Sequence, residues 1–234
     1  MQRGENMEFY GGTDIGKVRT ANQDSYYIDS ENCWAVVADG MGGHRGGETA
    51  SSMTVNIIKD SMSENQELVR AIESANSKVF EKSVKETEYS GMGTTVVLCK
   101  ISGNTATIAH VGDSRAYLVT HSGMKQITTD HSIVQQLIDS GTISKEQAKY
   151  HPQRNLITRA VGTEKGVAVD VNTTEFNDGD LILMCSDGLS SYVDEDDIHN
   201  IIINNPTDTA VLKLIDAANE TGGRDNVTIV LIKA

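Results

Sequence analysis

Four aspartates stand where strand-like runs meet glycine or polar turns, and their side chains could bind divalent cations. They are Asp39, Asp113, Asp187 and Asp225, in the local sequences WAVVADGMGG, ATIAHVGDSR, LILMCSDG and GGRDNVTIVLI. Carboxylate, carbonyl and water oxygens suit hard cations such as Mg²⁺ and Mn²⁺. Two such ions about 3.5 to 4 Å apart can hold a bridging water, lower its pKa and clamp a phosphoryl group. The pattern favours a metal-assisted phosphate hydrolase, with four ordinary turn aspartates as the alternative.

The segments that must position these carboxylates read as runs of strands alternating with pairs of helices. Glycine punctuation and β-branched residues predict strands, and apolar residues at helical spacing predict helices. The expected strands are residues 8–13, 25–28, 34–39, 94–102, 105–111, 116–120, 125–128, 167–176, 181–186 and 226–233, and the expected helices are 47–62, 64–85, 194–204 and 207–220, with a polar, helical stretch at 131–160. Paired helices favour antiparallel sheets covered by helical layers over a doubly wound parallel sheet.

Composition narrows the possible functions. The 234 residues, with 38% hydrophobic content and 2 prolines, suit a single domain, so residues 1–234 are expected to form one. A net charge of -13 argues against a nucleic-acid partner.

Cys33, Cys99 and Cys185 lack CxxC spacing and suit reduced, buried thiols. No signal peptide and no run of about 18 apolar residues is found, so we expect a cytoplasmic protein without a membrane anchor. Met7 is an alternative start, in which case residues 1–6 would be a disordered extension.

Eight motifs in a fixed order carry a resemblance to a known family. They are TDIGKVRTANQD, VADGMGGH, GMGTT, HVGDSRAY, TTDHS, HPQRNLITRAVG, CSDGL and GGRDNVT, and they span nearly the whole chain. Each motif is weak alone, but together they make chance similarity implausible. The chain resembles the metal-dependent protein phosphatases of type 2C, the PPM family, and in particular their short bacterial members.

The resemblance implies a fold and a metal centre. The fold would be α+β, a four-layer αββα sandwich of two antiparallel sheets between helix pairs. Two core Mn²⁺ or Mg²⁺ ions would be bridged by Asp39, with the Gly40 carbonyl on the first and Asp187 and Asp225 on the second. Asp113, sharing Asp187, would hold a third ion. Gln23 and Asp24 would act through metal-bound waters in the second shell.

The resemblance also implies an activity. A metal-bridging water or hydroxide would hydrolyse phosphoserine and phosphothreonine in proteins, reversing the action of a Ser/Thr kinase that is the expected partner. Arg19 would bind the substrate phosphate, which suits its planar, permanently charged fork. Residues 131–160 would form the flap beside the site, where Ser132 would lie near the third ion. We expect a monomer.

The chain departs from the family at one position that matters for the mechanism. Eukaryotic relatives carry a histidine after the Asp-Gly pair as a proposed general acid, and this chain has Met41, which cannot donate a proton. His44, a metal-bound water or no specific acid are the alternatives. His110, within a strand, is expected to be a packed core residue.

Rival functions fit less well. Gly11 to Lys17 has P-loop glycine spacing, but Val18 replaces the Ser/Thr that would ligate Mg²⁺. No cysteine has an arginine six positions later, which excludes the cysteine phosphatase signature. A GDS-type esterase would use Ser114 with His199, yet a strand follows Ser114 where such nucleophiles begin a helix. A non-enzymatic phosphoprotein-binding module is the last alternative, and the four intact aspartates argue against it.

Overall fold

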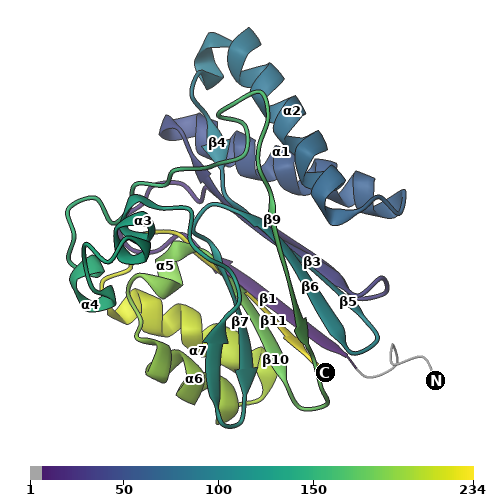
Figure 1. Cartoon of the computed structure of the whole chain (residues 1–234), viewed down its shortest axis with the longest axis vertical. Helices are drawn as coiled ribbons and strands as arrows, with labels where there is room; N and C mark the ends of the chain where they lie inside the picture. Colours follow the sequence, from purple (N-terminus) through teal and green to yellow (C-terminus); the bar gives the residue numbers. More distant parts are fainter. Residues whose placement is uncertain (1–6) are drawn as a thin grey trace.

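Two antiparallel β-sheets form the centre of the molecule (Figure 1). The computed structural model describes residues 7–234, so the extension considered for residues 1–6 lies outside the described residues. The first sheet has the order β1-β11-β10-β7-β8, with bounds Glu8–Asp14, Val227–Lys233, Leu181–Cys185, Arg115–Thr120 and Gly123–Gln126. The second has the order β2-β3-β5-β6-β9, with bounds Asp24–Asp29, Trp34–Met41, Val96–Ser102, Thr105–Val111 and Asp170–Glu175, and the short β4 (Gly93–Thr94) pairs with β3.

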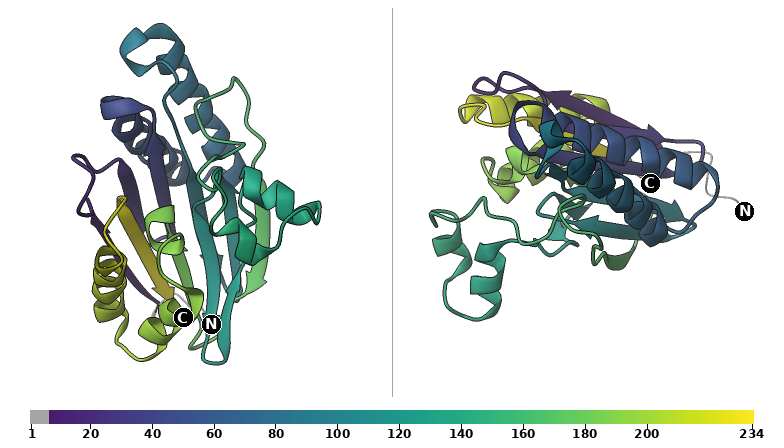
Figure 2. Two further views of the ribbon diagram at one scale, coloured as in Figure 1. Left: turned by 90° about the vertical axis from the view of Figure 1, so that its left-hand side faces the viewer. Right: turned by 90° about the horizontal axis from the view of Figure 1, so that it is seen from above.

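Helices cover the outer face of each sheet, which gives the expected four-layer αββα arrangement (Figure 2). The second sheet carries α1 (Gly43–Ser63) and α2 (Leu68–Lys85), followed by a 3₁₀ turn at Thr87–Tyr89. The first sheet carries α5 (Asp187–Ser190), α6 (Glu195–Ile203) and α7 (Thr207–Glu220). None of the helices within residues 7–234 combines the length and the apolar character needed to cross a membrane.

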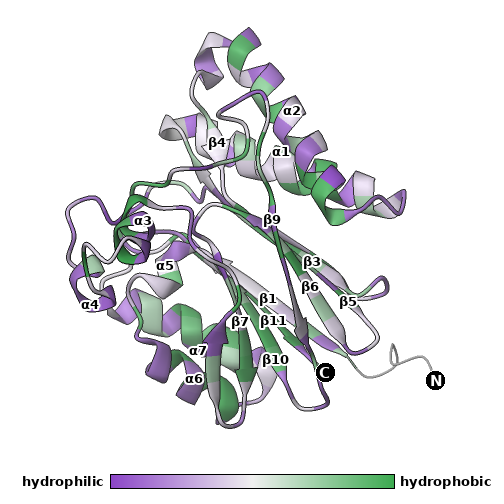
Figure 3. Ribbon diagram, in the orientation of Figure 1, coloured by the Kyte–Doolittle hydropathy of each residue, from purple (hydrophilic) through white to green (hydrophobic). Residues whose placement is uncertain are grey.

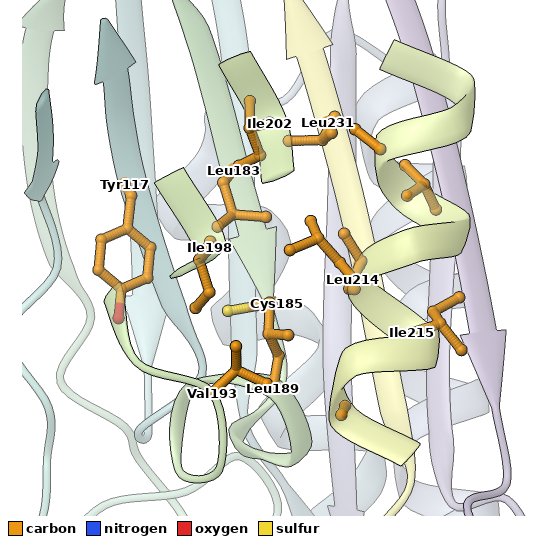
Figure 4. Close-up of a cluster of buried hydrophobic side chains, with 14 of the residues drawn as sticks. Tyr117, Leu183, Cys185, Leu189, Val193, Ile198, Ile202, Leu214, Ile215 and Leu231 are labelled. Atoms are coloured by element: carbon orange, nitrogen blue, oxygen red, sulfur yellow. The ribbon is translucent and has the colours of Figure 1, made fainter. Parts of the chain in front are cut away.

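Three apolar layers hold the sandwich together. Ile108, Ile182 and Val230 lie between the two sheets. A second layer, between the first sheet and helices α6 and α7, includes Leu183 and Leu214 (Figure 4). The third packs α1 and α2 on the second sheet. Burying a side chain of this size fully contributes about 1.5–3 kcal/mol. In Figure 3 the central strands carry much of the hydrophobic colour, whereas β9 at the edge of the second sheet is hydrophilic.

Local interactions move several element boundaries from the expected positions. Helix α2 begins at Leu68 and not at Glu64, because Asn65 has a left-handed φ of 58° that separates it from α1. Strand β8 ends at Gln126, since the Thr128 hydroxyl replaces a backbone acceptor for the Ala116 amide. The expected helical stretch at 131–160 holds only two short helices, α3 (Ile133–Asp139) and α4 (Lys145–Ala148), joined by turns.

Strand register brings distant segments to one edge of the sandwich. In the first sheet Cys185, at the end of β10, lies opposite Ile229 of β11 and Arg115 of β7. In the second sheet the start of β2 pairs with the end of β3, placing Asp24 opposite Asp39. Because antiparallel neighbours exchange ends in this way, the turns that carry the aspartates collect at the same edge.

Candidate active site

A cavity of about 390 Å³ opens at this edge. It is lined by Arg19, Thr20, Ala21, Gln23, Asp39, Gly40, Met41, Gly42, Gly43, Thr95, Asp113, Asn155, Ile157, Asp187, Asp225 and Asn226. All four aspartates identified in the sequence therefore converge. Asp39 lies inside β3, which continues to Met41, and so does not close its strand as expected. Asp24 does not line the cavity and is buried beside it, with 8% of its surface exposed.

The carboxylates raise one another's pKa values. For Asp187, burial and then the charges of Asp113 and Asp225 raise the pKa from 3.8 to about 8. Burial, followed by the charges of Asp24 and Asp187, also raises the pKa of Asp39 well above its ordinary value. For Asp113, burial raises the pKa to about 6. Acidic groups gathered out of water at this density destabilise the ionised form unless cations balance them.

Buried carboxylate oxygens in and beside the cavity bear on whether it suits a cation. Among the described residues, neither Asp187 Oδ1 nor Asp24 Oδ1 has a hydrogen-bond partner. The other oxygen of Asp24 accepts a hydrogen bond from the Ser186 hydroxyl at 2.7 Å. A buried polar oxygen without a partner is costly and uncommon, and hard divalent cations take oxygen ligands. The donor set therefore fits Mg²⁺ or Mn²⁺.

Glycines bring the backbone of the site into close contact. A Cβ on Gly40 would lie 2.1 Å from the carbonyl oxygen of Gly47 and 2.6 Å from that of Gln23, so no side chain fits there. The start of α1 thus crosses directly over the end of β3. The Gln23 side chain, predicted to act through metal-bound water, donates to the Gly43 carbonyl at 2.7 Å and so holds this glycine loop. The close packing leaves the Gly40 carbonyl fixed at the wall of the cavity.

Arg19 lies on the loop between β1 and β2, at the mouth of the cavity. Its Nη2 donates to Asp225 Oδ2 at 2.8 Å, and 49% of the side chain is exposed. The hydrogen bond to Asp225 raises the pKa of the guanidinium. Arg19 lines the cavity and is half-exposed, which suits the predicted phosphate-binding role.

Asn226 holds this loop, and sequence reasoning did not assign it a role. Its amide donates to the carbonyls of Ile15 and Ala21, both at 3.0 Å, and its Oδ1 accepts from the Gln23 amide at 2.8 Å. The residue is buried, with 4% of its surface exposed. Asn226 follows Asp225 within the GGRDNVT motif, and this position was the one feature of the sequence that could have pointed to a role at the site. Asn155 and Ile157, from the predicted flap, also line the cavity without having been singled out.

The described histidine side chains lie outside the cavity lining. His110 is fully buried, as expected, and stacks on His131 at a ring-centroid distance of 4.8 Å. The backbone amide of Gly112 donates to His131 Nδ1 at 3.0 Å, so this ring supports the turn before Asp113. The side chain of His44, one alternative for the general acid, lies outside the described residues. Ser132 caps α3 by accepting from the Gln135 amide.

His110, His131 and Asp170 place possible ligand atoms within 4.8 Å of one another, yet this group is already balanced. Arg159 Nη1 donates to Asp170 Oδ1 at 2.6 Å and lies 3.0 Å from His131 Nε2. The guanidinium thus occupies the place of a cation. The acidic cavity is the better candidate for metal binding.

The structure contradicts two rival sites. Gly11 and Gly12 lie within β1, paired with β11, so they form no phosphate-binding loop. Ser114 is 1% exposed and sits at the start of β7, whereas His199 contacts the carbonyl of Thr120 at the other end of that strand. Strands rise about 3.3 Å per residue, which separates the two by far more than a catalytic contact.

Comparison with known proteins agrees with the site. Residues 12–213 match the model of the protein phosphatase 2C family. A serine/threonine phosphatase stp from Listeria innocua is 37% identical over 94% of this chain and 93% of its own length. The structure of the serine/threonine phosphatase PstP/Ppp of Mycobacterium tuberculosis has a TM-score of 0.90 and 35% identity, covering 97% of this chain and 98% of that one.

A second solved structure bears on the metal. The catalytic domain of the serine/threonine protein phosphatase PstP, in complex with two manganese ions, has a TM-score of 0.88 and 33% identity, covering 97% of each chain. The expected fold and the resemblance are both confirmed. This chain belongs to the protein phosphatase 2C family.

Proposed function

We propose that the acidic cavity is the catalytic centre of this enzyme, with named roles for its residues. The chain is a metal-dependent protein phosphatase acting on phosphoserine and phosphothreonine. Asp39, Asp187 and Asp225, with the Gly40 carbonyl, would hold two divalent cations, and Asp113 with Asp187 a third. The observation that carries this assignment is the convergence of these carboxylates on one cavity, with the Asp187 Oδ1 atom buried and unpartnered within the described chain.

Mn²⁺ or Mg²⁺ bound there lowers the pKa of water and neutralises phosphoryl charge. The residues of the chain then orient the substrate. Arg19 binds the phosphate oxygens at the cavity mouth, and Asn226 fixes the loop that carries it. Asp24, which accepts a hydrogen bond from the Ser186 hydroxyl, would act on the ions through metal-bound water. No cysteine or histidine of the described residues lines the cavity, so a cysteine or histidine nucleophile has no support there.

Phosphoproteins are the substrates. We further propose that a Ser/Thr kinase acts on the same proteins, that the enzyme is a cytoplasmic monomer, and that residues 1–234 form one catalytic domain. Residues 131–160 serve as the flap, and the presence of Asn155 and Ile157 in the cavity wall supports a role in substrate choice.

Phosphate release from a phosphothreonine peptide tests the site. Purified wild-type protein and the Asp187→Ala variant are assayed with and without Mn²⁺, beside Asp216→Asn as a control on the exposed face of α7. We expect Mn²⁺-dependent turnover in the wild type and the control, and none above background in Asp187→Ala. Turnover that persists in Asp187→Ala would overturn the assignment.

Arg19→Ala tests the phosphate contact separately. Because the guanidinium contacts the substrate phosphate at the cavity mouth, KM should rise about tenfold or more. Mn²⁺ affinity is measured in the same variant, because Arg19 also pairs with Asp225. An unchanged KM would remove Arg19 from the site.

A further inference from the structure

Thr95 connects two metal-binding segments through one hydroxyl group. The residue lies between β4 and β5, is 4% exposed and lines the cavity. Its Oγ1 accepts a hydrogen bond from the Asp39 amide at 3.0 Å and lies 2.7 Å from Ser114 Oγ. Either hydroxyl can donate in the Thr95–Ser114 hydrogen bond, because Thr95 Oγ1 can accept from Asp39 and still donate or accept once more. The result is a hydrogen-bonded chain from Asp39 to the residue after Asp113.

The methyl group of Thr95 supports the same turn from another side. Gly112 has a φ of +105°, and a Cβ built on it would lie 2.6 Å from Thr95 Cγ2. The threonine side chain therefore packs directly on the backbone that precedes Asp113. Only glycine leaves room for this contact.

The peptide of Asp39 is held on both sides by the same short segment. Its carbonyl accepts from the Thr95 amide and from the Thr94 hydroxyl, both at 2.8 Å. Its amide donates to the Thr95 side chain, as described. The position of the Asp39 carboxylate along β3 is thus tied to that of Thr95.

We propose that Thr95 is a positioning residue whose hydroxyl couples the Asp39 strand to the Asp113 turn and so sets affinity for the third cation. The inference rests on the proposed roles of Asp39 and Asp113. Asp113 is on a turn, so its carboxylate is placed by the backbone around it, and the Thr95–Ser114 bond is the side-chain link from that backbone to the Asp39 strand. Loss of a partner behind a metal ligand commonly costs 10- to 100-fold in affinity.

Three variants separate the hydroxyl from the methyl group and from the turn. Thr95→Val keeps the shape and removes the hydroxyl, and Thr95→Ser does the reverse. Ser114→Ala breaks only the link to the turn. Each is titrated with Mn²⁺ by calorimetry, and phosphate release is measured as a function of Mn²⁺ concentration.

We expect Ser114→Ala to weaken only the last of three Mn²⁺ ions, by about tenfold. Thr95→Val should weaken that ion similarly and also affect the tight pair through Asp39, whereas Thr95→Ser should stay within about twofold of the wild type. Thermal unfolding without metal identifies any variant that fails to fold; Ser114→Ala then carries the test.

Three results would overturn the inference, and they differ in what else they overturn. If wild type binds three ions and both Thr95→Val and Ser114→Ala bind them equally well, Thr95 has no positioning role and the proposed metal site stands. If wild type binds only two ions, the role of Asp113 fails and this inference fails with it. Equal losses in Thr95→Ser and Thr95→Val would assign the effect to packing and also overturn it.

Discussion

Two groups of aspartates lie near the same end of this molecule and differ in whether a basic side chain of the protein pairs with them. Asp130 accepts three hydrogen bonds from Arg115, at 2.7 to 3.1 Å, and Asp170 pairs with Arg159. Asp39 and Asp187 have no basic residue of the chain as an ion-pair partner within the described residues.

The pKa values follow this difference. Although partial burial opposes it, the hydrogen bonds from Arg159 and His131 lower the pKa of Asp170. Burial and neighbouring acids raise that of Asp187 to about 8. Arg115 and Arg159 balance Asp130 and Asp170, whereas Asp39 and Asp187, two of the proposed metal ligands, are left for added cations to balance. Asp225 stands between the two groups, because it is a proposed metal ligand that also pairs with Arg19.

The largest expected effect comes from removing a carboxylate that lacks an internal partner. A metal ion contributes several kcal/mol to stabilising transition-state charge, so Asp187→Ala should lose at least about 1,000-fold in kcat/KM. Steady-state kinetics at saturating Mn²⁺ measures it. A loss below tenfold would place Asp187 among the structural aspartates.

Asp130→Asn tests the aspartates that are paired with arginine. Removing one partner of a buried ion pair leaves Arg115 uncompensated and costs about 3–5 kcal/mol. For a chain of this size the Tm should fall by roughly 6–20 °C, as read by calorimetry. Activity measured well below that Tm should be retained far better than in Asp187→Ala. A Tm within 2 °C of wild type would contradict the comparison.

The aspartates without a basic partner should make the stability of the metal-free protein depend on pH. The folded pKa of Asp187 lies above its ordinary value of 3.8, at about 8. Its contribution to stability is therefore present below about pH 4 and is lost as the pH rises through 8. With EDTA present, the Tm of the wild type should fall between pH 5 and pH 8. Asp187→Asn should flatten this fall and raise the Tm at neutral pH. A steeper fall in the variant would contradict the sign.

Mn²⁺ should restore the stability that the metal-free protein loses at neutral pH. A ligand at 100 times its Kd adds about 2.7 kcal/mol of stability, so the Tm of the wild type at pH 7.5 should rise by roughly 5–11 °C. Asp187→Asn should show a much smaller rise. Equal rises in both proteins would mean that Mn²⁺ binds elsewhere.

The smallest effect is expected from Asp170→Asn. This side chain is 46% exposed, and a pair so open to water contributes about 0–1 kcal/mol. Its Tm should change by less than about 4 °C. A large fall would show that the stacked His131 and His110 depend on Asp170 more than its exposure indicates.

Residue types and the glycine or polar turns beside apolar runs identified the proposed metal ligands from the sequence. Asp113, Asp187 and Asp225 each follow or precede an apolar run beside glycine or polar residues, and the edge of antiparallel sheets is where such residues meet. Paired helices between strand runs predicted antiparallel sheets covered by helical layers, and the family resemblance implied the four-layer αββα sandwich. These features depend on local pattern, and the structure confirms the architecture.

Contacts between distant segments could not be predicted in this way. Asn226 reaches Ile15 and Ala21 across more than 200 positions, and the Thr95 hydroxyl meets Ser114 from another strand. The sequence of a motif does not show which distant backbone group a polar side chain will hydrogen-bond. The expected helical stretch at 131–160 was wrong in extent because turns interrupt it, with Gly141 at a φ of 72° after α3.

Because strand register assembles the cavity, the two ends of the sandwich should differ in how well they tolerate inserted residues. One extra residue in β10 would turn Cys185 away from both Ile229 and Arg115 and carry Asp187 out of place. The hairpins at 102–105 and 120–123 and the first and last described residues lie at the opposite end of the strands (Figure 1). Epitope tags, fluorescent labels and circular permutation breakpoints belong there, where changes in length leave the aspartates in register.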